Sequence, residues 1–104
     1  MRFFITATLD TEAGNEMILS GQIGPVLQQL LGDLKPEAAY FLPANGRRAM
    51  HLVVNANDPS EIVPLLEPFW LFTKSDLQVT PCMNQEDLQK GISALPPVIK
   101  KYER

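Results

Sequence analysis

The sequence predicts an α+β fold whose elements follow the order strand, helix, strand, strand, helix, strand. Residues 2–9 and 77–82 alternate between apolar and other side chains, as half-buried strands do. Ala44-Asn45-Gly46-Arg47 is a tight-turn signal between two further strands. Two stretches with apolar residues at three- and four-residue steps separate the strands. This order is that of a split βαβ unit, and it predicts a ferredoxin-like βαββαβ sandwich with a four-stranded antiparallel sheet.

Size and composition limit the possible functions. The chain has 104 residues, which predicts one domain, residues 1–104, with residues 84–104 as a C-terminal helical extension. The net charge is −3 and no basic run occurs, which argues against nucleic-acid binding. Apolar stretches are far shorter than the about 20 residues of a membrane span. With no leader pattern and a lone Cys82, we expect a cytoplasmic protein without an intrachain disulfide.

The first strand is expected to lead into a helical stretch. Asp10 or Thr11 can cap this helix at its start. Its second half carries the best apolar stripe, formed by Ile23, Val26, Leu27, Leu30, Leu31 and Leu34. Gly24-Pro25 opposes a regular helix and predicts a kink or break near this pair. Lys35-Pro36 is expected to end the segment, since a residue before proline avoids the α region.

The remaining elements are predicted from turn and cap signals. Residues 38–42 and 49–55 are strands of a hairpin, and Asp58-Pro59 opens the second helix. Pro64 and Pro68 predict that this helix is short and distorted. After the last strand, Asn84 caps a small helix that Pro96-Pro97 is expected to interrupt, leaving residues 98–104 as a mobile or partner-docked tail.

The two faces of the predicted sheet differ in character. The first and third strands are expected at its centre, and both helices should cover the face that carries Phe3, Ile5, Ala7, Leu52, Val54, Leu77 and Val79. The other face then carries a mixed set: Phe4, Thr6, Thr8, His51, Val53, Asn55, Gln78 and Thr80. Because this set is too apolar to face water, we expect a second copy to cover it. A cavity should remain between the sheet and the helices, or between the two sheets.

Several segments resemble a known superfamily. Leu65-Leu66-Glu67-Pro68-Phe69-Trp70-Leu71-Phe72 runs into Leu77-Gln78-Val79-Thr80-Pro81, and this ending is similar to that of the muconolactone isomerases among the dimeric α+β barrel proteins. Residues 35–41 and 84–88 resemble a small, uncharacterised bacterial group of that superfamily. The resemblance implies a homodimeric α+β barrel. It transfers no catalytic residue, and the superfamily includes isomerases, cofactor-free monooxygenases, haem-degrading enzymes and binding domains.

His51 is the candidate catalytic residue. It is the only histidine and falls in mid-strand on the mixed face, where it could transfer protons near neutral pH. The alternative is a histidine that is hydrogen-bonded across the dimer sheet. Thr6 and Thr80 on neighbouring strands could orient its imidazole and bind substrate, or could be ordinary strand residues.

Other candidates for substrate binding come from aromatic and basic residues. Tyr40 offers a phenol, and the pattern does not settle whether Tyr40 or Phe41 faces the cavity. Trp70 could wall a pocket or be buried against a partner. Arg48, beside Arg47 at the hairpin turn, could hold a carboxylate or be solvated.

These residues support two functional hypotheses. One histidine, one cysteine and no carboxylate pair at ligand spacing predict no metal site, and no nucleotide-binding motif occurs, so we expect no cofactor. In the first hypothesis a homodimer binds a small organic ligand or a partner without catalysis. In the second it is a cofactor-independent isomerase or monooxygenase of a small aromatic or carbonyl compound, with His51 as the proton-transfer group.

Overall fold

The computed structural model describes residues 1–103. Its elements are β1 (Arg2–Thr8), α1 (Thr11–Leu19), α2 (Ile23–Leu34), β2 (Ala38–Ala44), β3 (Arg47–Asn55), a 3-10 turn (Pro59–Glu61), α3 (Ile62–Thr73), β4 (Asp76–Cys82), α4 (Gln85–Ser93) and α5 (Leu95–Tyr102). Within these residues no helix combines the length and the apolar character needed to cross a membrane.

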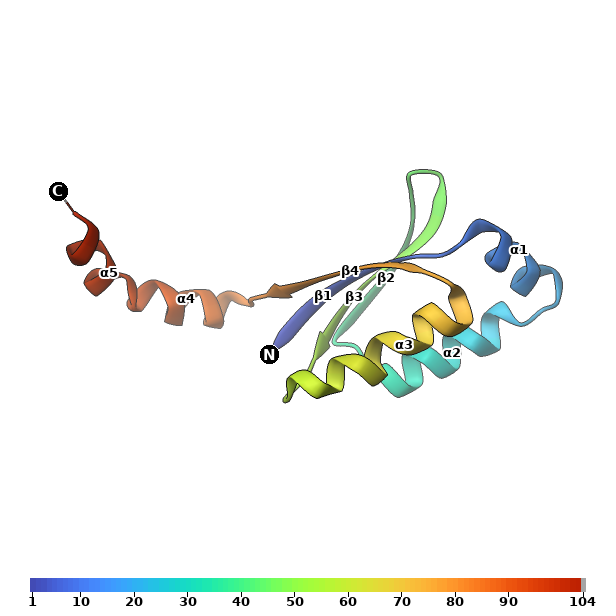
Figure 1. Ribbon diagram of the computed structural model, residues 1–104, viewed down its shortest axis with the longest axis horizontal. Coiled ribbons are helices and arrows are strands. Elements are labelled where there is room, and N and C mark those ends of the chain that lie inside the picture. The colour runs from blue at the N-terminus through green and yellow to red at the C-terminus, as the bar shows by residue number, and fades with distance from the viewer. Residues whose placement is uncertain (104) are drawn as a thin grey trace.

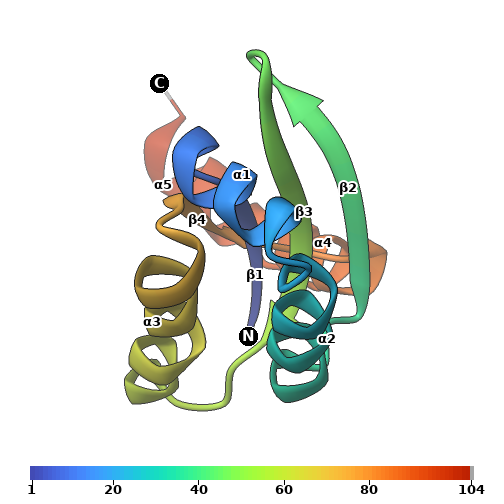
Figure 2. The same ribbon diagram turned by 90° about the vertical axis from the view of Figure 1, so that its right-hand side faces the viewer.

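The four strands form one antiparallel sheet in the order β2-β3-β1-β4. The first and third strands therefore lie at its centre, and the predicted α+β class and antiparallel sheet are confirmed. This order is compatible with a ferredoxin-like fold. Helices α2 and α3 lie side by side on one face of the sheet (Figures 1 and 2). The opposite face carries neither of them, and we call it the helix-free face.

The core lies between the sheet and helices α2 and α3. Ile5, Leu52 and Val54 from the central strands are 0–1% exposed, and Phe69 of α3 is 1% exposed. Phe3, Leu77 and Val79 pack against this core as partly buried residues, in agreement with the predicted apolar face. Other members of the cluster are Ala7, Leu9, Leu30, Met50 and Leu66.

The first helical stretch is divided, as the sequence suggested, although not at the expected pair. Asp10 caps α1, because its carboxylate accepts a hydrogen bond from the Ala13 amide at 3.0 Å. The chain then breaks at Gly21, which has a φ of 77°, a conformation that favours glycine. The break expected near Gly24-Pro25 therefore occurs, but a few residues earlier, at Gly21. Pro25 lies in the first turn of α2, where a missing N–H donor costs nothing.

The second predicted helix is longer than expected. After the turn opened by Asp58, α3 runs for 12 residues through both Pro64 and Pro68, so the expectation of a short helix is wrong. Pro64 falls in the first turn, where its missing donor is tolerated. Only Pro68 lies in the helix interior, where proline removes one backbone hydrogen bond. Burial of the neighbouring Phe69 in the core holds the helix in place despite this loss.

The C-terminal residues form two helices that project from the sheet (Figure 1). Asn84 and Asp87 form a reciprocal capping box at the start of α4. Helix α4 ends at Ser93, just before Pro96 and Pro97, so the expected interruption is found. The two prolines nevertheless lie in the first turn of a new helix, α5, which the sequence did not predict. We call residues 85–102 the arm. The arm stretches the molecule to 62 Å, with a radius of gyration of 17.7 Å against about 13 Å for a compact chain of this size.

Candidate functional site

The helix-free face carries a row of polar side chains across its middle. The strand register places Tyr40 beside His51, His51 beside Thr6, and Thr6 beside Gln78. Neighbours in register point to the same face of a sheet, so these residues share one surface. Tyr40 therefore belongs to the helix-free face and Phe41 to the other, which answers the question that the alternation left open.

A second row on this face is largely apolar. It runs from Ala38 through Val53 and Phe4 to Thr80. The Phe4 and His51 rings meet with their centroids 5.1 Å apart at a tilt of 58°. Phe4, His51 and Val53 are half-buried by their neighbours alone. The centre of the face is thus a mixture of aromatic, aliphatic and hydroxyl groups.

Charged side chains close the two ends of this face. At one end, Arg47 donates hydrogen bonds to the carbonyl of Leu9 at 2.9 Å and to the carboxylate of Asp76 at 3.1 Å. This arginine therefore links the end of β1 to the start of β4.

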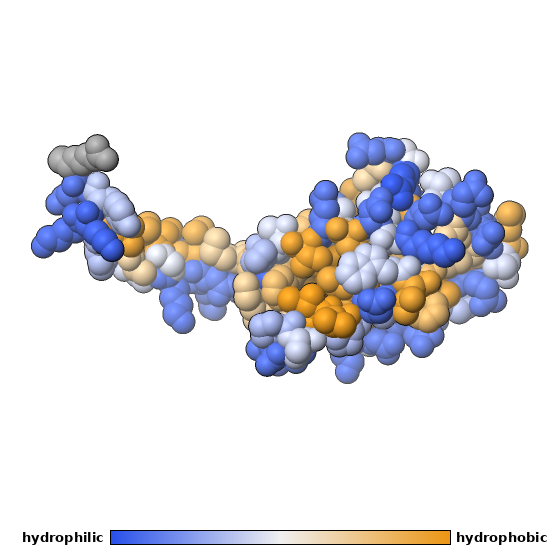
Figure 3. Space-filling view, viewed as in Figure 1, coloured by the Kyte–Doolittle hydropathy of each residue, from blue (hydrophilic) through white to orange (hydrophobic). Residues whose placement is uncertain are grey.

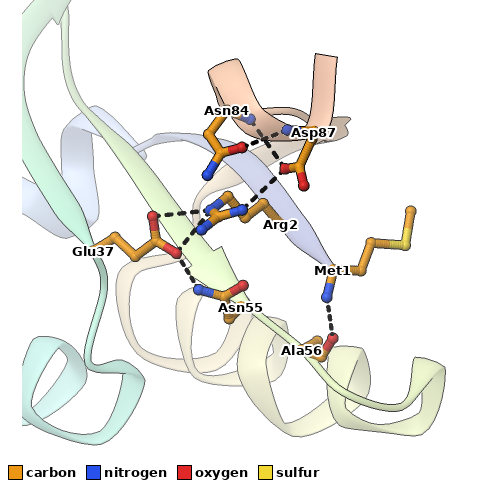
Figure 4. Close-up of polar contacts among 7 residues, drawn as sticks. All are labelled: Met1, Arg2, Glu37, Asn55, Ala56, Asn84 and Asp87. Carbon is orange, nitrogen blue, oxygen red and sulfur yellow. Dashed lines mark hydrogen bonds and ion pairs between the residues drawn. The ribbon is translucent and has the colours of Figure 1, made fainter. Parts of the chain in front are cut away.

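At the other end, the Arg2 guanidinium binds the carboxylates of Glu37 at 2.9 Å and Asp87 at 3.0 Å (Figure 4). The Asn55 amide also donates to Glu37. Hydrogen bonds from Asn55 and Arg2 lower the pKa of the Glu37 carboxyl. This cluster connects the start of the arm to three strand ends.

A cavity lies on the opposite side of the sheet, under the β2–β3 hairpin. Its volume is about 440 Å³, within the range of small-molecule sites. Apolar side chains dominate its lining, among them Leu9, Ile23, Leu27, Phe41, Pro43 and Met50, and Arg48 is the ionisable residue that lines it. The cavity can therefore accept an apolar molecule with an anionic group at its edge.

The position of Arg48 depends on helix α1. Its guanidinium donates a hydrogen bond to the Asn15 side-chain oxygen at 3.1 Å. A Cβ on Gly14 would lie 2.9 Å from Arg48 Nη1, so a glycine is what lets the arginine lie against the helix. Arg48 remains exposed and retains further N–H donors for a ligand.

The predicted site residues divide between separate surfaces. His51, Thr6, Tyr40 and Thr80 share the helix-free face, whereas Arg48 lines the cavity beneath the other face. Trp70 lies on α3 and is 46% exposed. Within residues 1–103, no side-chain hydrogen bond joins His51 to Tyr40 or Thr6. The structure thus places Thr6 and Tyr40 beside His51 and separates Arg48 and Trp70 from them. Thr80 shares the face but lies on β4, with β1 between it and the strand of His51, so the expectation that its strand neighbours that of His51 is wrong.

Sequence reasoning missed the cavity residues that come from the helical stretch. Ile23 and Leu27 were assigned only to a core stripe, and Gly14 and Asn15 were assigned no role. The Leu9 amide donates to the Arg48 carbonyl at 2.9 Å and α1 begins at Thr11, which brings Gly14 and Asn15 near Arg48. The turn at Gly21 then leads into α2, which adds Ile23 and Leu27 to the cavity. The signal that could have found them was Gly21 itself, read as the turn between two helices.

Within residues 1–103, no group of three or more His, Cys, Asp or Glu side chains is placed to hold a metal ion.

Comparison of the chain with models of known protein families gives no match, and comparison with curated proteins gives none either.

Proposed function

We propose that this chain forms a homodimer through its helix-free face and binds a small, mostly apolar organic acid in the cavity under the hairpin. The observation that carries the proposal is the cavity of about 440 Å³ with apolar walls and Arg48 at its edge. An apolar body supplies most of the binding energy in such a site, and a charge-assisted hydrogen bond to the guanidinium orients the anion.

The dimer is supported by the composition of the helix-free face. Phe4 and Val53 lie side by side at its centre and are only half-buried within one chain. Thr6, His51 and Gln78 beside them can pair with polar groups of a second copy. Charged groups lie at the ends of the face, where an interface rim is expected. The two sheets would then close into a dimeric α+β barrel.

The position of His51 supports binding rather than catalysis as the main function. His51 contacts Phe4 on the helix-free face, whereas the cavity lies on the helix side of the same sheet. A ligand held by Arg48 is therefore separated from the imidazole by the sheet. The isomerase or monooxygenase alternative would need a second ligand site at the sheet-to-sheet contact.

Binding of an acid and of its methyl ester tests the proposal. We expect octanoate or cinnamate to bind the wild-type protein about five- to tenfold more tightly than the matching methyl ester, measured by isothermal titration calorimetry. This ratio corresponds to the about 1 kcal/mol expected of an exposed charged pair. Arg48→Met should bind acid and ester equally, because the ester contacts only the apolar walls.

Lys90→Gln is the control, since it removes one positive charge from an exposed site on α4. This variant should keep the wild-type preference for the acid. Equal binding of acid and ester by the wild-type protein, or binding of neither, would reject the proposed ligand class.

A further inference from the structure

The arm carries an apolar stripe with no cover. Leu88, Ile92, Leu95, Ile99 and Tyr102 follow one another at steps of four, three, four and three residues, which places them along one side of the helices. Each is between 44% and 72% exposed. Exposed apolar rows of this length mark interaction surfaces in soluble proteins.

The opposite side of the arm is polar. Lys90 lies nearly half a helical turn away from both Leu88 and Ile92, and Glu86 and Ser93 lie on the two flanks of that polar side. Figure 3 shows the same division, with apolar atoms on the upper side of the arm and hydrophilic atoms below and at its end. The arm is therefore amphipathic, and its apolar side is suited to packing against another protein surface.

The arm is fixed at its start and free along its length. The Arg2–Asp87 ion pair and the Asn84–Asp87 capping box hold the first turn of α4 against the sheet (Figure 4). Beyond that turn, every residue through position 103 is exposed. The anchored start sets the direction of the arm away from its own domain, so its own core does not cover the stripe.

We propose that the arm packs its apolar stripe against the body of a second copy of this chain, beside the sheet-to-sheet contact. This inference rests on the proposed homodimer and adds a second contact surface to it. Because two copies are related by symmetry, each arm then holds the other copy, and the dimer contains two such contacts.

Interface area favours a second copy as the occupant. Four strands at about 4.8 Å spacing and seven residues at about 3.3 Å rise give the helix-free face a flat area of roughly 450 Å². A stable dimer usually buries about 800 Å² on each partner. The latter figure counts accessible surface, which exceeds flat area, so the sheet face is at most of the size that a stable dimer needs. The arm is the uncovered apolar surface of the same chain that can enlarge the contact.

The arm and the helix-free face also adjoin each other. In Figure 1 helices α2 and α3 lie below the sheet, and in the matching view of Figure 3 the apolar side of the arm faces upward, toward the side without those helices. The corner between arm and sheet is hollow, with a volume of about 400 Å³, and is lined by Met1, Pro81, Cys82 and Met83 together with the Arg2–Asp87 pair. A copy seated on the helix-free face would lie on the Arg2–Asp87 side of this corner, next to the stripe.

Charge is complementary in the same arrangement. Residues 1–83 contain nine acidic and five basic residues, whereas residues 84–104 contain three acidic and four basic ones. Lys100 and Lys101 lie in the last turn of α5, near the end of the arm. An arm laid on a partner body therefore brings a basic end to a net acidic surface, which favours that pairing over contact between two arms.

A matched pair of full-length variants tests the arm contact. Ile92→Asp places a charge within the stripe, and Ser93→Asp places the same charge on the polar side of the same helix. Sedimentation velocity over a concentration series gives the dimer dissociation constant of each. We expect Ile92→Asp to raise it at least tenfold, because both arms of a dimer are affected, and Ser93→Asp to leave it within twofold. Circular dichroism confirms that both variants keep their helices.

Cross-linking of an equal mixture of ¹⁴N- and ¹⁵N-labelled protein then distinguishes an arm that contacts the body of the partner copy from an arm that folds back onto its own body. Links between Lys100 or Lys101 and Lys35 or Lys74 should include pairs of mixed isotope. A dimer unchanged by Ile92→Asp, or arm-to-body links without mixed pairs, would overturn the inference and leave the sheet-to-sheet dimer standing. A wild-type protein that stays monomeric would reject the dimer and the arm contact together.

Discussion

Gly14→Ala should separate the stability of helix α1 from the function of the cavity. Gly14 is buried in α1 without a positive φ, so alanine gains about 1 kcal/mol of helix propensity. The new Cβ would lie 2.9 Å from Arg48 Nη1, which is the mobile end of a long side chain and can move away. Losing the exposed Arg48–Asn15 hydrogen bond costs roughly 0.5 kcal/mol. The variant should therefore be about 0.5 kcal/mol more stable in urea unfolding.

Ligand binding should change in the opposite direction. Displacing the guanidinium should weaken octanoate binding by about threefold, a loss of roughly 0.6 kcal/mol. Gly32→Ala is the matched control, because a Cβ at Gly32 of α2 meets no atom within 4 Å. The control should gain the same helix propensity and keep its affinity for octanoate. A loss of more than about 1 kcal/mol of stability in Gly14→Ala would refute the view that Arg48 is free to move.

Three further substitutions test other parts of the structure. His51→Gln should leave octanoate affinity within twofold in calorimetry, and a tenfold loss would place His51 at the ligand. The lowered pKa of Glu37 means that its ion pair stabilises the fold above the usual glutamate pKa of about 4.3, and that this contribution is lost as the pH falls through the folded-state value. NMR titration should therefore show a Glu37 midpoint that rises in Arg2→Met, and an unchanged midpoint would contradict the pairing. Thr73→Val should cost about 1–3 kcal/mol in urea unfolding, because it leaves the buried Ser75 hydroxyl without its 2.7 Å partner, and a neutral effect would mean that water replaces it.

The sheet could be predicted from the sequence because its signals are local. The period-two alternation of residues 2–9 and the Asn45-Gly46 turn each depend only on neighbouring residues. Both turn residues have the positive φ that such a turn needs, 52° and 76°. The strand order then follows from the common topology of the split βαβ unit.

The cavity could not be predicted because it depends on how distant segments pack. It combines Gly14 and Asn15 of α1, Ile23 and Leu27 of α2, and Arg48 of β3, which come together only in the folded chain. The effect of the prolines was also predicted incorrectly. Pro25, Pro64 and Pro96 lie in the first turns of helices, where a backbone N–H has no acceptor within the helix, so its absence breaks no hydrogen bond. The presence of a proline in the sequence does not by itself indicate whether a helix begins or ends there.

The mass of the protein in solution tests the central claim that a second copy covers the helix-free face. Sedimentation equilibrium at micromolar concentration should give twice the chain mass of 11.6 kDa. Val53→Lys, at the centre of that face, should give the mass of one chain, while Val63→Lys, at an exposed position on α3, should remain a dimer. A wild-type mass of 11.6 kDa, or a dimer that survives Val53→Lys, would contradict the account.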